Sequence, residues 1–327
     1  MSQQKPFRFG LQAFNPSSPA AWRDMVRKSE DLGYSAYHLA DHFFGPGPAQ
    51  ESTGHPPQLL AAVPAMAMAL ELTDSIKVGC RVFCMDYRQP ITLAKEAATM
   101  DYLSDGRLEL GIGAGWIQAE YNAVNLPFDD IQVRLDRFEE VVGSVKQFMA
   151  GEPLEIDGEY IQWHGFSGIP ARPQCPPIMI GGGSKRVLTI AGREADIVSL
   201  NFNNRTGTLG PEGMISGLAE QTAKKIGWIR DGAGERFDDL EIEIGAYLTI
   251  VTDHQEATAK AIADPFGMPV EALLSGPHNL IGSVDYICEE LQRRRETYGI
   301  SYITVLDDGE NNMVEQFAPV VARLSGK

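Results

Sequence analysis

Residues 74–128 hold a strand, a helix, a second strand and a polar loop in unbroken order, and this stretch limits the possible folds more than any other. Residues 75–84 combine β-branched and apolar residues, a helical pattern spans 90–103, and a Ser-Asp-Gly turn precedes a second strand pattern at 107–112. A short helix between two strands favours parallel strands with a right-handed crossover. The stretch therefore predicts a βαβ unit.

The rest of the chain continues this alternation of strands and helices. Eight strands are predicted, at residues 7–14, 34–40, 75–84, 107–112, 176–180, 195–200, 240–251 and 302–306. Helical patterns between and after them include 18–32, 58–72, 132–149, 212–230, 255–262, 284–298 and 312–324. Longer connections after strands four, six and seven are insertions, and the first contains a hairpin turn at Asp157-Gly158. The pattern predicts a (β/α)8 TIM barrel forming a single domain over residues 1–327.

The acidic composition narrows the range of partners. The 327 residues include 28 basic and 44 acidic side chains, a formal net charge of −16. Such a surface repels nucleic-acid phosphates and anionic lipids. The N-terminal segment lacks a secretory signal pattern, and the apolar stretch 59–70 is too short to span a bilayer. We expect a cytoplasmic protein that binds neither nucleic acid nor membranes.

The cysteines and most histidines give no sign of a metal site. The four cysteines show no CxxC spacing, and we expect buried thiols at Cys80, Cys84, Cys175 and Cys288. The histidines other than His42 lie in strands or inserted loops and form no HxH or HxxE pattern. No metal is predicted.

In a parallel barrel the carboxyl ends of the strands form the active face, and Asp41 and His42 fall there. They directly follow the second strand. An imidazole with a pKa near neutrality is suited to proton transfer, so His42 is a candidate acid or base. A histidine at a strand end is also often structural, and the residue type alone does not separate the two roles.

A glycine cluster follows the fifth strand. Gly181, Gly182 and Gly183 are followed by Ser184 and a helical pattern, so bare backbone N–H groups and a helix N-terminus would face one anion, such as a phosphate. The cluster is neither a P-loop nor a GxGxxG turn. A purely structural glycine turn has the same composition.

The fourth strand ends in small residues and one large ring. Gly113 and Gly115 precede Trp116, and a bare backbone beside a large aromatic side chain suits a flat ligand or, alternatively, only a tight turn. Glu120 and Tyr121 follow as candidates to line the mouth, and Glu120 is also compatible with a solvated surface carboxylate.

Arg81 interrupts the apolar pattern of the third strand. A buried guanidinium has to be paired. Arg81 therefore either holds an anionic ring or phosphate or pairs with an acid such as Asp86 or Asp101. Asn201, after the sixth strand, is expected at the same rim.

Several of these stretches resemble a known family. FGLQ in the first strand, DHF after the second, the block RQPITLAKEAATMDYLSDGRLELGIGAGW and the segment PIMIGGGSKRVLTIAGREADIVSLN are similar to the luciferase-like flavin and deazaflavin monooxygenase and reductase superfamily. The similarity runs nearly from end to end. Within the superfamily, the chain most resembles the branch that uses the deazaflavin coenzyme F420.

The resemblance implies a bacterial-luciferase-like barrel in which the cofactor ring lies across the carboxyl-terminal mouth. Asp41 and His42 would lie beside the reactive edge of the ring, with His42 oriented by Asp41 or by a backbone group. The resemblance implies a cofactor site made of Cys80, Arg81, Val82, Gly113, Gly115, Trp116, Tyr121, Gly181, Gly182, Gly183 and Asn201. It also implies a non-prolyl cis peptide at Cys80-Arg81 or Arg81-Val82, and a homodimer formed through outer helices, for which 59–70 is a candidate.

By resemblance, the predicted function is an F420-dependent oxidoreductase that transfers a hydride between the deazaflavin and a small organic substrate. The alternative is a two-component monooxygenase that uses FMN reduced by a partner enzyme, and a third hypothesis is a non-catalytic flavin-binding barrel. Sugar-phosphate dehydrogenases of the F420 branch have glutamate where this chain has Trp116 and tryptophan where it has Pro46. We therefore expect an apolar or aromatic substrate that faces Trp116, Phe43 and Phe44.

Overall fold

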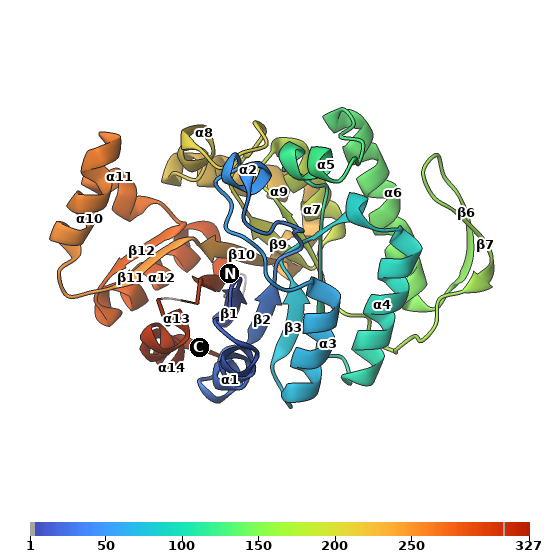
Figure 1. The fold of residues 1–327 in the computed structure, drawn as a ribbon, viewed down its shortest axis with the longest axis horizontal. Coiled ribbons are helices and arrows are strands. Elements are labelled where there is room, and N and C mark those ends of the chain that lie inside the picture. Colours follow the sequence, from blue (N-terminus) through green and yellow to red (C-terminus); the bar gives the residue numbers. More distant parts are fainter. Residues whose placement is uncertain (1–3, 310) are drawn as a thin grey trace.

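Eight parallel strands close into a barrel in the computed structural model, which describes residues 4–309 and 311–327 (Figure 1). Each strand pairs with its neighbour in the ring β1-β2-β3-β5-β8-β9-β10-β13, and β13 pairs with β1 to close it. The barrel strands are β1 (Arg8–Ala13), β2 (Ala36–Leu39), β3 (Lys77–Cys80), β5 (Leu108–Gly113), β8 (Ile178–Gly182), β9 (Ile197–Leu200), β10 (Glu241–Ala246) and β13 (Ile300–Asp307). The predicted (β/α)8 barrel is confirmed.

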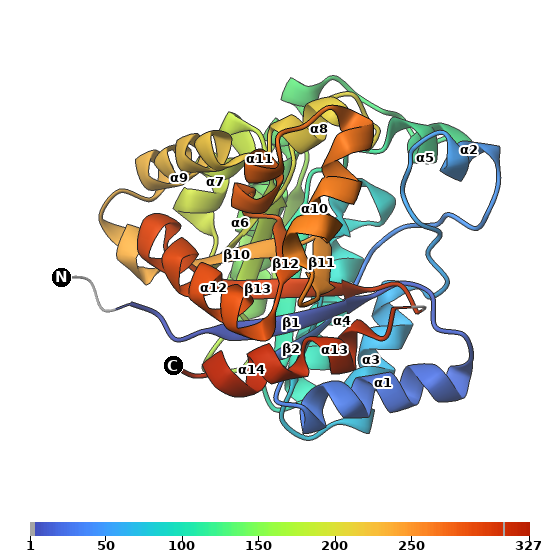
Figure 2. The same ribbon diagram turned by 90° about the vertical axis from the view of Figure 1, so that its left-hand side faces the viewer.

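Helices surround the barrel, and shorter ones cover its mouth. The outer helices are α1 (Pro19–Asp31), α3 (Ala62–Leu72), α4 (Pro90–Leu103), α6 (Ile131–Ala150), α7 (Lys185–Glu194), α9 (Ala219–Ala233), α12 (Val284–Tyr298), α13 (Met313–Gln316) and α14 (Ala318–Leu324). The connections at the carboxyl ends of the strands carry α2 (Pro48–Glu51), α5 (Gln118–Ala123) and α8 (Pro211–Ile215), which lie over the same end of the barrel in both views (Figures 1 and 2).

Helix α1 shows how local sequence sets these boundaries. Ser18 is its N-cap, since the side-chain oxygen accepts a hydrogen bond from the Ala21 N–H at 3.1 Å, and Pro19 occupies the first turn, where its missing N–H costs nothing. The face that carries Trp22 and Val26 is buried. A cap followed by apolar residues at helical spacing therefore identified this helix correctly from the sequence.

The third barrel strand is interrupted. A non-prolyl cis peptide joins Arg81 and Val82 between β3 and the short strand β4 (Phe83–Cys84), which pairs with β5. The cis peptide expected at one of two adjacent bonds is thus found at the second of them.

The insertions add two small sheets outside the barrel. After β5 the chain forms an antiparallel hairpin of β6 (Pro153–Asp157) and β7 (Gln162–Ser167), which projects beyond α6 in Figure 1. After β10 come β11 (Leu248–Val251), α10 (Gln255–Ala263), α11 (Val270–Ser275) and β12 (Asn279–Gly282), in which β11 pairs with β12. The described residues also form three 3-10 turns, which are η1 (Met85–Tyr87), η2 (Gly234–Asp239) and η3 (Asp264–Phe266).

Four local predictions were wrong. The strand expected over 240–251 is two strands, because the chain leaves the barrel at Tyr247 and continues into the separate β11–β12 sheet. The helix expected over 212–230 breaks at Gly217, where an added Cβ would lie 2.4 Å from the Phe202 ring. The helix expected from residue 58 begins at Ala62, because the preceding Gln58 N–H donates to the Phe44 carbonyl. Cys175, expected to be buried, is exposed.

Within residues 4–309 and 311–327, no helix combines the length and apolar character needed to cross a bilayer.

Candidate active site

His42 is held at the barrel mouth by Glu120. His42 follows β2 and Glu120 lies on α5, and the Nδ1 of His42 is 2.8 Å from the Oε2 of Glu120. Because a carboxylate only accepts, Nδ1 carries the hydrogen in this pair. The Nε2 of His42 has no hydrogen-bond partner among the described residues, and 13% of the side chain is exposed. The pair thus leaves one ring nitrogen available at the mouth.

Glu120 is fully buried and receives further hydrogen bonds. The Tyr87 hydroxyl donates to it at 2.6 Å, and so does the backbone N–H of Phe43. Burial alone would raise the pKa of Glu120, but the hydrogen bonds from His42, Tyr87 and Phe43 hold it below its ordinary value. Glu120 is therefore an ionised partner of His42 and not a solvated surface carboxylate.

Asp41 does not orient His42, and that expectation was wrong. Its two carboxylate oxygens accept from Arg88 at 2.6 and 2.8 Å, and one also accepts from the Cys84 N–H at 2.9 Å. Both partners belong to the segment that follows the interrupted third strand. Asp41 therefore joins the end of β2 to that segment. Adjacent side chains on an extended chain point in opposite directions, which is why Asp41 and His42 have different partners.

A second imidazole lies beside His42, and sequence reasoning did not single it out. The ring centroids of His42 and His55 are 4.1 Å apart, and Trp116 lies 6.5 Å from the first and 6.1 Å from the second. His55 is buried, and its Nδ1–H donates to the Pro56 carbonyl at 2.8 Å. Burial and the neighbouring His42 lower the pKa of His55 to about 3. No local pattern marks His55, because it lies in a glycine- and proline-rich loop.

Val82 lies between two glycines at the centre of the mouth. A Cβ added to Gly113 would lie 2.7 Å from one Val82 methyl group, and one added to Gly181 would lie 3.1 Å from the other. Both positions therefore need glycine so that Val82 can occupy this place. Cys80, on the other side of the cis peptide, is buried, and burial raises the pKa of its thiol well above the ordinary value.

The glycine turn after β8 leads into α7 without a side-chain cap. Ser184 is the N-cap residue of this ten-residue helix, and its side chain makes no capping hydrogen bond. Gly183 packs against backbone, since an added Cβ would lie 2.3 Å from the Phe202 carbonyl oxygen. Gly181 and Gly182 are the last residues of β8 and pair with β9, so the prediction that all three glycines follow the strand was wrong; the first turn of α7 still has helix N–H groups without a side-chain cap.

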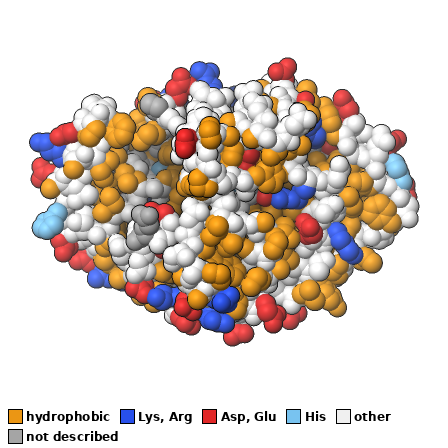
Figure 3. Space-filling model, in the orientation of Figure 1, with side chains coloured by type: hydrophobic (Ala, Val, Ile, Leu, Met, Phe, Trp, Pro, Cys, Tyr) orange, Lys and Arg blue, Asp and Glu red, His pale blue; other side chains and the backbone are white. Residues whose placement is uncertain are grey.

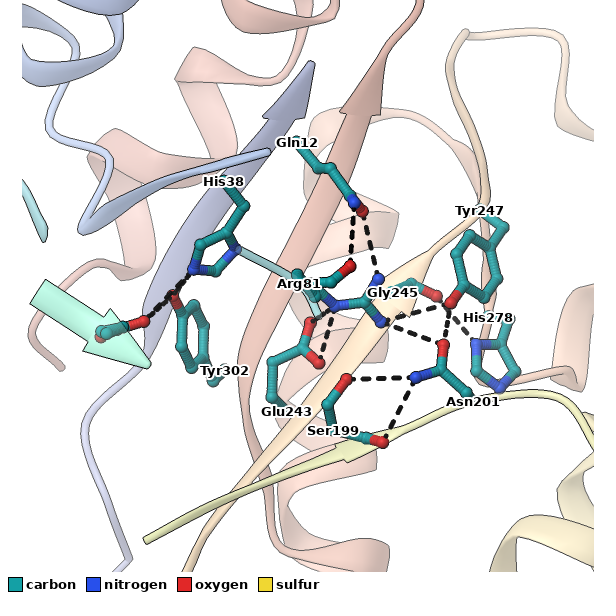
Figure 4. Close-up of polar contacts among 11 residues, drawn as sticks. Gln12, His38, Arg81, Ser199, Asn201, Glu243, Gly245, Tyr247, His278 and Tyr302 are labelled. Atoms are coloured by element: carbon teal, nitrogen blue, oxygen red, sulfur yellow. Dashed lines mark hydrogen bonds and ion pairs between the residues drawn. The ribbon is translucent and has the colours of Figure 1, made fainter. Parts of the chain in front are cut away.

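Arg81 is the centre of a buried polar network inside the barrel (Figure 4). Its Nε lies 2.9 and 3.0 Å from the two oxygens of Glu243, and its Nη2 donates to the Asn201 side-chain oxygen and to the Tyr247 hydroxyl, both at 3.3 Å. Burial opposes the charge, but Glu243 and Tyr247 raise the pKa of Arg81 above its ordinary value. Of the alternatives considered for Arg81, the structure shows pairing with an acid.

The acids suggested for Arg81 lie elsewhere. Asp86 pairs with Arg137 at 2.9 Å, and Asp101 lies 3.5 Å from Arg172. Glu243 was missed because it lies 162 residues away in the sequence. The one sequence feature that could have indicated Glu243 is that it is an acid within an apolar strand pattern. In the structure Glu243 lies on β10 and is fully buried.

Tyr121 and Phe44 do not line the mouth. The Tyr121 hydroxyl donates to Asp86 at 2.8 Å and lies 3.1 Å from the Cys84 sulfur, and the residue is fully buried. It lies under Gly115, where φ is +71° and an added Cβ would be 1.9 Å from that hydroxyl. Phe44 is also buried, whereas Phe43 is 49% exposed. Tyr121 therefore supports the turn that presents Trp116.

Among the described residues, no group of three or more His, Cys, Asp or Glu side chains is placed to hold a metal ion.

The protein is an α/β barrel of parallel strands. Its third strand is interrupted, and a histidine lies at its mouth. The profile of the luciferase-like monooxygenase family matches residues 6–322, and the chain belongs to this family. The family predicted from the sequence is confirmed.

The chain is also similar to individual relatives and to a solved structure. The chain is 27% identical over 243 residues to an F420-dependent glucose-6-phosphate dehydrogenase of Amycolatopsis mediterranei, covering 72% of this chain and 67% of the relative. It is 30% identical over 195 residues to the enzyme of the same name from Kineococcus radiotolerans, and there it spans 59% of this chain but little more than half, 56%, of the relative. An F420-dependent secondary alcohol dehydrogenase, solved with an F420-acetone adduct, shares the fold with a TM-score of 0.76 at 16% identity, covering 98% of this chain and 99% of that one.

Proposed function

We propose that this protein is an F420-dependent oxidoreductase that transfers a hydride between the deazaflavin and a small organic substrate. The observation that carries the proposal is the His42–Glu120 pair, which leaves a ring nitrogen of His42 available at the mouth. The relatives named above support the cofactor, because they are F420-dependent enzymes.

The residues at the mouth fit a planar cofactor with a phosphate. Gly113 and Gly181 make room for the Val82 side chain, so a flat ring at this place would lie against Val82. The uncapped first turn of α7, with Gly182 and Gly183 before it, offers backbone N–H groups to a phosphate. When bound, the deazaflavin supplies the carbon that gives or accepts the hydride.

His42 would exchange the proton that accompanies the hydride. Its Nε2 is the available nitrogen, and the negative charge of Glu120 at Nδ1 stabilises the imidazole when Nε2 takes up a proton. Tyr87 and the Phe43 N–H fix the Glu120 carboxylate in turn. We assign Asp41 a positioning role, because it holds Arg88 and the Cys84 N–H at the end of the third strand.

We further propose an apolar or aromatic substrate. Trp116, His55 and the exposed Phe43 present rings at this end of the barrel, and His55, with its low pKa, adds no charge. The relatives named above act on glucose 6-phosphate, but this chain has Trp116 and Pro46 where the sugar-phosphate enzymes of the branch have glutamate and tryptophan. The phosphate of such a substrate would find aromatic side chains here.

Two further properties are proposed. The first is a homodimer formed through outer helices, since Leu59 and Met68, before and on α3, are 61% and 50% exposed. The second is a cytoplasmic location, which the acidic composition supports. Light scattering coupled to gel filtration tests the first, and a single-chain mass at micromolar concentration would refute it.

The cofactor is tested by binding. Purified protein is titrated separately with reduced F420 and reduced FMN, and oxygen uptake is then followed with each. We expect F420 to bind at least about tenfold more tightly, a difference of about 1.4 kcal/mol, without oxygen consumption. Tight FMN binding with oxygen uptake would instead identify a two-component monooxygenase and overturn the proposal.

A further inference from the structure

A cavity of about 410 Å³ lies outside the barrel mouth. Its walls come from the segment after β4, the first turn of α4, the N-terminal half of α6 and the β6–β7 hairpin (Figure 1). The lining residues that the structure describes include none of the residues proposed for catalysis or cofactor binding. Pockets for small molecules commonly have volumes of about 300–1,000 Å³, so the cavity is large enough for a ligand of its own.

One cation in this cavity has no carboxylate partner. The lining residues Arg88 and Arg137 are paired with Asp41 and with Asp86 and Asp129, respectively, whereas Arg134 is in no ion pair among the described residues. Its other walls are largely apolar, with Ile91, Leu126, Phe138 and Trp163 among them. Figure 3 shows basic side chains among hydrophobic ones on this side of the molecule. A cavity with mixed polar and apolar walls and one arginine without a carboxylate partner suits an organic anion.

Two of the arginines are fixed by the protein and keep donors free. Arg134 is only 7% exposed, its Nε donates to the Asp129 carbonyl at 3.1 Å, and its Nη1 donates to the Ala114 and Gly115 carbonyls at 3.1 and 2.8 Å. Its Nη2 has no hydrogen-bond partner within the described part of the chain. Arg88 directs Nη1 and Nη2 to Asp41, and its Nε is likewise without a partner there. Guanidinium groups held in this way are preorganised for an anion.

We propose that this cavity binds a small organic anion, with a flat apolar body against Phe138 and Trp163 and one carboxylate or phosphate group at the arginines. Such a ligand would make the charge-assisted hydrogen bonds that Arg134 Nη2 and Arg88 Nε do not make within the protein. It would contact the arginines that hold Asp41 and Gly115 without entering the mouth. The site is separate from the proposed cofactor site and does not depend on the proposed reaction.

The probe is 2-naphthoate, a flat aromatic carboxylate, added to the full-length protein in isothermal titration calorimetry at low salt. We expect one molecule per chain and much weaker binding of the uncharged 2-naphthalenemethanol. Arg137→Gln leaves Asp86 and Asp129 without their arginine and so makes the cavity negative, and Gln162→Trp, at an exposed lining position of the hairpin, reduces its volume; each should weaken 2-naphthoate binding at least tenfold. Arg193→Gln makes the same charge change on the outer face of α7 and should leave the affinity within about twofold.

Trp116→Ala changes the mouth but not the lining of the cavity, and it should therefore leave 2-naphthoate binding unchanged. A loss of binding in this variant would place the probe in the mouth and overturn the proposal. No binding to the unmodified protein, or equal binding in Gln162→Trp and Arg193→Gln, would also overturn it. If Arg137→Gln does not fold, as judged by circular dichroism, Gln162→Trp carries the test alone.

Discussion

Two histidine–glutamate pairs occur in this barrel, and they have opposite environments. His42 and Glu120 meet at the rim, 2.8 Å apart, between the loop after β2 and α5. His38 and Glu109 meet between β2 and β5 inside the barrel, 3.2 Å apart, and both side chains are buried. The same two residue types thus form one pair at the surface of the mouth and one in the core.

The inner pair has no ring nitrogen available to a substrate. His38 uses Nε2 for Glu109 and for the Tyr302 hydroxyl, and its Nδ1 is buried without a partner among the described residues (Figure 4). Arg8 binds the other oxygen of Glu109. In the outer pair, His42 uses Nδ1 and leaves Nε2 for the mouth. A pair can exchange a proton with a substrate only if the second ring nitrogen is accessible. This condition holds for His42 and not for His38.

The two carboxylates also differ in what their charge balances. Burial would raise the pKa of Glu109, but Arg8 and His38 hold it down to about 2, so its negative charge is balanced by a permanent cation. Glu120 is paired with no arginine or lysine among the described residues, and its other donors, Tyr87 and the Phe43 N–H, are neutral. The charge of Glu120 therefore remains available to a protonated His42.

The largest expected effect is on turnover at the outer pair. His42→Ala removes the proposed proton-transfer group and should lower kcat by about 100- to 10,000-fold, while the dissociation constant for F420 changes by less than about threefold. Steady-state kinetics and a binding titration measure the two quantities. His254→Ala, at an exposed position, is the matched control. Unchanged turnover in His42→Ala would remove its catalytic role.

The inner pair should instead affect stability. Glu109→Ala leaves His38 and Arg8 without their shared acceptor, and we expect a loss of roughly 3 kcal/mol in the free energy of unfolding, at the lower end for a broken buried pair because Arg8 retains Glu241. Urea denaturation measures this loss. Glu315→Ala, in the exposed pair with Lys28, should change stability little. Equal losses in the two variants would contradict the difference between core and surface pairs.

The sequence was sufficient for elements whose boundaries depend on local signals. The alternation of strands and helices, the cap of α1 and the existence of the β6–β7 hairpin follow from patterns within a few residues of each other, although the hairpin loop comprises residues 158–161 and not a turn at Asp157-Gly158. The split of 240–251 did not follow, because Tyr247 turns toward Arg81, 166 residues earlier in the chain. Packing between distant segments decides such boundaries, and no local pattern records it.

The same division applies to the candidate site. Strand ends in a parallel barrel meet at one face, so His42, Val82, Gly113 and Gly181 could be placed together before the structure was known. Their partners could not. Glu120 was a candidate for the mouth, but its bond to His42 was not predicted, and Glu243 and His55 were not singled out; the fold brings these partners together from α5, β10 and the loop after α2. Residue type at a strand end thus predicts position, whereas hydrogen-bond partners depend on tertiary contacts.

Acid should destabilise the unmodified protein more than the Glu109→Gln variant. The pKa of Glu109 in the folded protein, about 2, lies below the ordinary value of 4.5, so its charge stabilises the folded state fully above about pH 4.5 and progressively less as the pH falls toward 2. The stability of the unmodified protein should therefore fall more steeply in this window than that of Glu109→Gln. Urea midpoints at several pH values measure the slopes, and parallel slopes would exclude Glu109 as a cause.

The smallest expected effect tests the comparison most directly. Glu120→Gln keeps the shape of the side chain but removes the charge that faces His42, so kcat should fall about tenfold, or about 1.4 kcal/mol, with little change in KM. Glu109→Gln is the matched variant, since it removes the same charge from the other histidine, and it should leave kcat of the folded protein unchanged. If both substitutions lowered kcat equally, the charge would act through the barrel as a whole. The opposite pattern, a loss confined to Glu120→Gln, follows only if the carboxylate acts through the Nδ1 of His42.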